Sequence, residues 1–244
     1  MTRHLLQGRS ESELLWFRRR GFLQAAATWT ALGGLAAAHA QQRGNVVELV
    51  GEVLLNGQRL RPGQSVQTSD RIETGPDSQL LFVMGNASFL VRQNSRLSME
   101  RGATLMSVSV LRLLAGGVVG AWSRGSHRQL VLPGLTAGIR GTGTYAEVVP
   151  GGRSYFCNCY GIVDVSSGAE RVTSSAQYHQ AFWGEPDPVN GRLLTPAPAI
   201  NHSDEEVEKL AALVNERTAW QILGRKGARD GSGSLDPQPH PLAR

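Results

Sequence analysis

Two cysteines and two histidines are the residues of this chain whose chemistry best suits metal binding. Cys157 and Cys159 are its only cysteines, and they lie two positions apart in a stretch whose pattern predicts a β-strand. Side chains at positions i and i+2 of a strand point to the same face, so both sulfurs are expected on one side. Thiolates combined with the imidazoles of His179 and His202 suit Zn²⁺ or copper as Cu⁺. These four residues form the candidate metal site.

Two other interpretations of the cysteine pair compete with the metal site. A disulfide between Cys157 and Cys159 is expected if the chain enters an oxidising compartment. Their Cα atoms would lie about 6.7 Å apart in a regular strand, which is at the limit of disulfide reach, so this bond would need a bulge. Alternatively, the two residues are small buried side chains or free thiols.

The sequence contains no recognisable catalytic constellation. No serine lies in a G-x-S-x-G turn and no H-E-x-x-H motif occurs, although both are signatures of common hydrolases. Gly141, Gly143 and Ala146 match the spacing of a dinucleotide-binding loop, but a strand-like segment at 145–149 stands where the required helix should begin. We expect these glycines to permit a bulge or a tight bend instead. We predict no enzyme activity, no catalytic residue and no cofactor apart from a metal ion.

The elements that would position the site are predicted to be β-strands. From residue 46 to about residue 182, short apolar runs alternate with turn residues, and helical periodicity is almost absent. Asn56-Gly57 between two such runs predicts a hairpin, because both central residues of a type I′ turn need a positive φ. Strands at this spacing, without helices between them, indicate an antiparallel sandwich, roll or barrel. The predicted fold class is all-β, with a β-domain at 41–183.

The chain changes character after this β-domain. Residues 184–224 begin with a proline-rich stretch, predicted to be an extended strap, and continue into one amphipathic helix. Ser203 and Glu206 have the spacing of a capping box, and Asn201 and His202 are expected to belong to this cap rather than to act in catalysis. Apolar residues follow at helical spacing, namely Val207, Leu210, Ala211 and Val214. Residues 225–244, rich in glycine, serine, proline and charge, are predicted to be disordered.

The first 40 residues have the pattern of an export signal. Arg19 and Arg20 precede a weakly apolar stretch that closes with Ala38-His39-Ala40, which is the order of charged region, apolar region and cleavage site in secretory signals. The arginine pair followed by Gly-Phe-Leu is typical of twin-arginine export. The alternative is an uncleaved membrane anchor, but the apolar stretch reaches spanning length only by including polar residues. We expect a soluble periplasmic chain without a membrane span after cleavage.

The net charge of +5 does not indicate a nucleic-acid partner, because the basic excess lies at the two ends of the chain. Residues 41–222 contain sixteen basic and sixteen acidic residues. A surface that binds DNA or RNA needs clustered lysine and arginine to displace counterions from phosphates. We therefore predict no nucleic-acid binding.

Several motifs of the predicted β-domain occur in a characteristic order. They are V-V-E-L-V-G-E-V-L-L-N-G at 46–57, D-R-I-E-T-G at 70–75 and T-A-G-I-R-G-T-G-T at 136–144. In order and spacing, residues 46–165 resemble the FecR domain, the periplasmic module of iron-dicitrate transport regulators. C-x-C-Y-G at 157–161 and N-H-S-D at 201–204 are similar to a proteobacterial subgroup of that family. The resemblance implies a FecR-like form of the sandwich or roll.

The resemblance also implies a non-catalytic module that senses a ligand or binds another protein of the cell envelope. In the iron-citrate regulators a cytoplasmic segment controls a sigma factor, but only about seventeen residues precede the arginine pair here, so that role is not expected. We predict an exported FecR-type protein-interaction module with an envelope protein as its partner. The alternative is a periplasmic metal-binding protein that uses Cys157, Cys159, His179 and His202.

Overall fold

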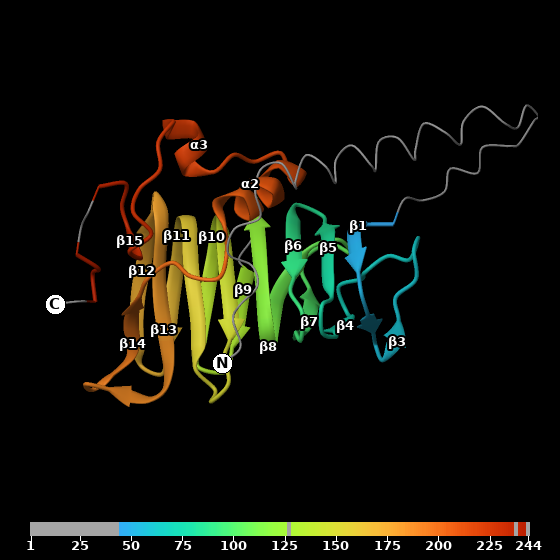
Figure 1. Ribbon diagram of the computed structural model, residues 1–244, viewed down its shortest axis with the longest axis horizontal. Helices are drawn as coiled ribbons and strands as arrows, with labels where there is room; N and C mark the ends of the chain where they lie inside the picture. Colours follow the sequence, from blue (N-terminus) through green and yellow to red (C-terminus); the bar gives the residue numbers. More distant parts are fainter. Residues whose placement is uncertain (1–43, 126–127, 237–238, 243–244) are drawn as a thin grey trace, which may run out of the picture. The chain divides into compact units, whose positions relative to one another are not determined.

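Residues 44–125, 128–236 and 239–242 are described by the computed structural model in Figure 1. The predicted export signal at 1–40 lies outside these residues. Within the described ranges, no helix is both long and apolar enough to cross a membrane.

Strands dominate the described part of the chain, and two short helices follow near its C-terminal end (Figure 1). The strands are β1 (Val46–Val50), β2 (Val53–Leu55), β3 (Gln58–Arg59), β4 (Arg71–Thr74), β5 (Gln79–Met84), β6 (Ala87–Val91), β7 (Arg96–Arg101), β8 (Val108–Trp122), β9 (Arg128–Leu132), β10 (Leu135–Val148), β11 (Ser154–Ser167), β12 (Glu170–Ala176), β13 (Tyr178–Val189), β14 (Arg192–Ala197) and β15 (Ser232–Gly233). The helices are α2 (Asp204–Leu213) and α3 (Ala219–Leu223).

The strands pair in one continuous sheet, which the long strands β8, β10 and β11 divide into two layers. The N-terminal half of β8 pairs with β7 and β9, whereas its C-terminal half pairs with β6 and β10. In the same way, the N-terminal half of β10 pairs with β9 and its C-terminal half with β8. The N-terminal half of β11 pairs with β13 and its C-terminal half with β12. The first layer therefore contains β2, β3, β4, β7, β9 and β12, and the second contains β1, β5, β6, β13 and β14.

Two glycines lie where β10 and β11 pass from one layer to the other. Gly141 and Gly161 have φ angles of +105° and +97°, which residues with a Cβ rarely adopt. The register between the two strands shifts between Ile139 and Thr142. The bulge predicted from the glycine-rich motif is therefore confirmed, and it bends the paired strands together.

Side chains alternate between two hydrophobic cores. The first core lies between the two layers, and the second lies between the outer face of the second layer and the helices α2 and α3. In β11, Phe156 belongs to the first core, whereas Tyr155 and Cys157 belong to the second. This alternation follows the two-residue period of a strand, and it places the cysteines beneath the helices.

The all-β class and the first predicted hairpin are confirmed. Asn56 and Gly57 connect β2 and β3 with φ angles of +53° and +79°, as a type I′ turn requires. The sheet is not wholly antiparallel, however, because β8 and β9 pair in parallel.

The C-terminal region differs from its prediction in three respects. The single predicted helix is two helices, because Asn215 (φ +57°) interrupts it and a second capping box, formed by Thr218 and Gln221, begins α3. Three prolines of the predicted strap lie in the β13–β14 hairpin: Pro186 and Pro188 lie in β13 at the register shift between Gly184 and Val189, and Pro196 lies in β14, an edge strand that tolerates a missing N–H. The described part of the predicted disordered tail is ordered, because β15 pairs with β13 and its neighbouring cations bind a buried carboxylate.

Candidate metal centre

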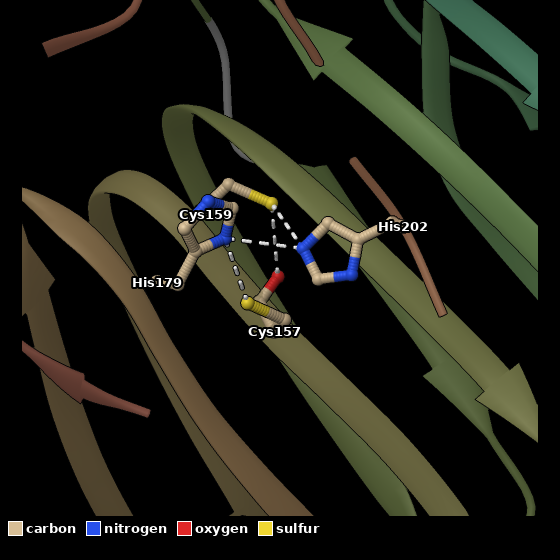
Figure 2. Close-up of side chains that lie close together, drawn as sticks. All are labelled: Cys157, Cys159, His179 and His202. Carbon is tan, nitrogen blue, oxygen red and sulfur yellow. Dashed lines mark hydrogen bonds between the residues drawn. The ribbon is translucent and has the colours of Figure 1, made fainter. Parts of the chain in front are cut away.

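Cys157, Cys159, His179 and His202 converge between the second layer and α2 (Figure 2). One ligand atom from each residue lies within 4.8 Å of those from the other three. The cysteines come from β11, His179 from β13, and His202 from the segment before α2. The first three are fully buried and His202 is 7% exposed. The whole candidate set from the sequence is thus brought together, from three segments of the chain.

Three of the six distances between the ligand atoms match those of a tetrahedral metal site, and the other three are at most 4.8 Å. Cys157 Sγ lies 3.6 Å from His179 Nδ1, and Cys159 Sγ lies 3.5 Å from His202 Nε2. The two imidazole nitrogens are 3.1 Å apart. Around a tetrahedral zinc ion with ordinary bond lengths, sulfur–nitrogen distances are about 3.6 Å and nitrogen–nitrogen distances about 3.3 Å. The residues could therefore hold a metal ion with little movement.

Hydrogen bonds on the far side of each imidazole determine which nitrogen faces the cluster with a lone pair. His202 Nδ1 lies 2.7 Å from the carbonyl oxygen of Ile200, which can only accept, so Nδ1 carries the hydrogen. His179 Nε2 lies 2.9 Å from the Asp204 carboxylate and donates to it. His202 Nε2 and His179 Nδ1 are then the nitrogens available as metal ligands. Metal-binding histidines are ordinarily oriented by such outer hydrogen bonds.

The contact between these two nitrogens favours a positive species. Two lone pairs that face each other at 3.1 Å repel, and a proton or a metal ion between the rings of His179 and His202 would remove that repulsion. Burial lowers the pKa of His179, but its hydrogen bonds with Asp204 and Cys157 outweigh burial and raise the pKa above the ordinary value. His179 therefore holds a second proton more readily than an ordinary histidine, and a metal ion at this position would replace that proton.

Irregular backbone aims three of the four ligands into the site. The register of β10 and β11 shifts so that Cys159 has no opposite residue and occupies a bulge. His179 has a φ of +38°, at a register shift between β13 and β15, and Asn201, next to His202, has a φ of +58°. Bulges reorient side chains, and strained backbone is concentrated at functional sites. The bulge and the unfavourable φ angles thus occur at, or directly beside, three of the residues that bring the ligand atoms together.

Asp204 connects the site to the C-terminal segment. Besides His179, it accepts hydrogen bonds from Tyr178 and Arg229, at 2.9 and 2.7 Å, and pairs with Lys226 at 2.8 Å. Burial raises the pKa of this carboxyl, but the bonds from His179 and Lys226 outweigh burial and hold the pKa well below its usual range. The ionised carboxylate is thus a fixed acceptor for the His179 N–H.

The two thiols differ in acidity. Burial raises the pKa of Cys157, but its contacts with Cys159, His202 and His179 outweigh burial, so the pKa lies well below the ordinary value. Burial, and then the neighbouring Cys157, raise the pKa of Cys159 well above the ordinary value. Cys157 is therefore the thiol that loses its proton more readily, and a metal ion bound by both cysteines would displace the proton of Cys159.

Aromatic rings hold both imidazoles in place. The ring of Tyr145 stacks on His202 at 4.8 Å between centroids, with an interplanar angle of 25°. The ring of Trp220 stacks on His179 at 5.2 Å and 28°. Because each ligand ring is also hydrogen-bonded on its far side, neither can turn away without breaking both contacts.

The structure decides between some of the sequence-based interpretations and adds residues that they missed. Both cysteines are free thiols in this structure, so the disulfide is not formed. Ser203, and not Asn201 or His202, caps α2, together with Glu206. The sequence explained Asp204 only as a charge in the first turn of a helix and placed Arg229 in a disordered tail. No local signal in the sequence identifies these two as partners of the site.

Comparison of the chain with protein-family models, with curated proteins and with solved structures finds no match. The resemblance to the FecR domain therefore stays a prediction, and the function must be argued from the site.

Proposed function

We propose that this chain is a metal-binding protein in which Cys157, Cys159, His179 and His202 hold one thiophilic ion, as Zn²⁺ or Cu⁺. The observation that supports this proposal best is the convergence of two sulfurs and two lone-pair nitrogens in a buried core, with two sulfur–nitrogen distances and the nitrogen–nitrogen distance near tetrahedral values. Thiolate and imidazole ligands favour zinc and copper over magnesium or calcium, which prefer oxygen.

Four protein ligands complete a tetrahedral shell, so the ion has no open position for a substrate. Closed sites of this composition are structural, whereas catalytic zinc sites keep one position for water. The site is accordingly proposed to be non-catalytic. The ion would connect β11, β13 and the segment that begins α2, and so fix the C-terminal helices on the second layer.

The predicted export signal adds a location to this proposal, and the FecR-type resemblance adds a partner. In this account a metal-holding β-domain works in the periplasm and contacts another envelope protein. Twin-arginine export carries folded proteins, so an ion acquired before export would remain enclosed in the second core.

The test is reconstitution of the full chain with Zn²⁺ or Cu⁺ after chelation, followed by measurement of bound metal. Cys157→Ser and His202→Gln should each weaken binding strongly, because each removes a ligand. His240→Gln is the matched control, since His240 is also buried but its hydrogen bonds among the described residues are to the backbone, at Ala181 O and Leu242 N. Equal metal binding in Cys157→Ser and the unsubstituted chain would overturn the proposal.

A further inference from the structure

The segment that follows α3 contacts both histidine ligands of the candidate site. We call residues 225–236 the C-terminal flap; they include β15 and bond to β13 and to the segment before α2. The Arg229 guanidinium donates to the carbonyl oxygen of His202 at 2.6 Å, and its other terminal nitrogen lies 3.3 Å from His179 Nε2. Among the four ligands only His202 has exposed surface, so the flap lies beside the part of the site nearest to solvent.

Backbone hydrogen bonds join the flap to the chain on both sides of His179. The N–H groups of Gln177 and Ala181 donate to the carbonyl oxygens of Gly233 and Gly231, at 2.8 and 3.1 Å. His179 lies between these bonds, at the register shift of the β13–β15 ladder, and its φ is +38°. A backbone in this region persists only where the surrounding structure enforces it. The flap therefore holds His179 in the conformation that directs Nδ1 toward the site.

The flap itself is attached with little apolar burial. Leu235 is its only buried apolar side chain, whereas α2 places three such side chains in the second core. The two flap cations that pair with Asp204 are partly exposed, Lys226 by 47% and Arg229 by 33%, so water and salt screen these pairs. Segments with few buried apolar contacts open at low free energy. Among the elements that cover the site, the flap is thus the one that opens most easily.

We propose that opening of the C-terminal flap is the step by which the metal ion enters and leaves the site. In the open state Asp204 lacks its two flap cations, and His179 lacks the backbone bonds that enforce its φ. The His179 imidazole can then move away, which leaves three protein ligands and one open position for an incoming chelator or water. Because entry and exit use the same opening, the flap determines the rate of exchange and not the affinity. This inference rests on the proposed metal-binding function.

Leu235→Ala tests the flap because it removes the apolar anchor but no ligand and no bond to Asp204. The full chain is loaded with Zn²⁺ or Cu⁺, whichever it retains, and release is followed after mixing with excess chromophoric chelator. Uptake by the metal-free chain is followed by tryptophan fluorescence, since Trp220 stacks on His179. We expect both rates to rise about tenfold or more, with the affinity unchanged in an equilibrium competition.

Hydrogen exchange gives a second measurement that needs no metal. The N–H groups of Gln177 and Ala199 donate to the flap carbonyl oxygens of Gly233 and Arg229. In metal-free Leu235→Ala, these two amide hydrogens should exchange faster by a factor similar to that of metal uptake.

Leu60→Ala is the matched control, because Leu60 is about as buried as Leu235 but belongs to the first core. It should lower the free energy of unfolding and leave both rates unchanged. Should Leu235→Ala fail to fold, Gly231→Ala replaces it, because the added Cβ would overlap the Ala197 carbonyl oxygen and displace the flap.

Three results would overturn the flap while leaving the metal-binding function intact. They are unchanged rates in Leu235→Ala, equal acceleration by Leu60→Ala, which would indicate exchange through global unfolding, and faster release without faster uptake, which would indicate a loss of affinity. A chain that binds neither Zn²⁺ nor Cu⁺ would overturn both proposals.

Discussion

Asp204→Asn is the substitution that probes the support of the metal centre most sharply. The carboxylate oxygen Oδ1 accepts from His179 and Arg229, and Oδ2 accepts from Tyr178 and Lys226. An asparagine keeps the shape but replaces one oxygen by an NH₂ group. Whichever way the amide is turned, its NH₂ group faces two side chains that themselves donate hydrogen bonds, so two bonds of Asp204 are lost.

The expected loss is large because the site is buried and its bonds are charge-assisted. Two such bonds, each worth about 1.5–3 kcal/mol, and the uncompensated cation beside them lower the free energy of unfolding by about 3–5 kcal/mol. The pKa of His179 also falls and its N–H loses a strong acceptor, so metal affinity should fall about 10- to 100-fold. Urea denaturation of the metal-free chain and competition with a chromophoric chelator measure the two effects separately.

Glu205→Gln is the matched control. It removes one negative charge from the same helical turn, but the Glu205 side chain is 68% exposed and lies 3.6 Å from Lys226. Exposed pairs of this kind contribute at most about 1 kcal/mol. If Asp204→Asn changed stability and metal affinity no more than Glu205→Gln does, the argument that Asp204 fixes the His179 ligand would be refuted.

Three further predictions concern the rest of the domain. Burial raises the pKa of Glu185, but hydrogen bonds from Arg153 and Thr195 outweigh burial and lower this pKa. The ionised carboxylate therefore stabilises the fold fully above the ordinary carboxyl pKa, and this stabilisation is lost as the pH falls through the folded value. The free energy of unfolding should depend less steeply on acidic pH in Glu185→Gln, and an unchanged pH profile would contradict this. Gly143→Ala should cost about 1–3 kcal/mol, because its Cβ would lie 2.5 Å from the Tyr160 ring. Gly75→Ala, with ordinary contacts at 3.5 Å, should cost less in the same urea titration, and equal costs would count against the close packing. Chelation should speed hydrogen exchange in α2 and α3 while leaving β4 and β7 protected; uniform protection would show that the ion does not hold the helices.

The candidate site could be predicted from the sequence because its ligands are chemically distinctive. Cys157 and Cys159 are the only thiols of the chain, and the strand period places them on one face. The structure shows that a bulge at Cys159 modifies this simple geometry. Bulges of this kind depend on the opposing strand, so a single segment does not reveal them.

The residues that hold the metal ligands in place could not be predicted from the sequence, because they come from segments far from the ligands along the chain. Composition indicated disorder around Arg229, but its guanidinium bonds to the Asp204 carboxylate and to the His202 carbonyl oxygen. A buried carboxylate needs cationic partners, and they come from a segment that has no hydrophobic pattern. In the same way, the prolines after residue 185 indicated a strap, whereas pairing with β13 makes β14 an edge strand.

The central claim is that Cys157 and Cys159 are metal ligands. The most direct test is elemental analysis of the full chain purified without a chelator, combined with a thiol count under denaturing conditions. We predict equimolar zinc or copper, with both cysteines reactive as thiols once the metal has been removed. A protein that contained no metal and no free thiol would have a local disulfide in place of the site, and that result would contradict the account.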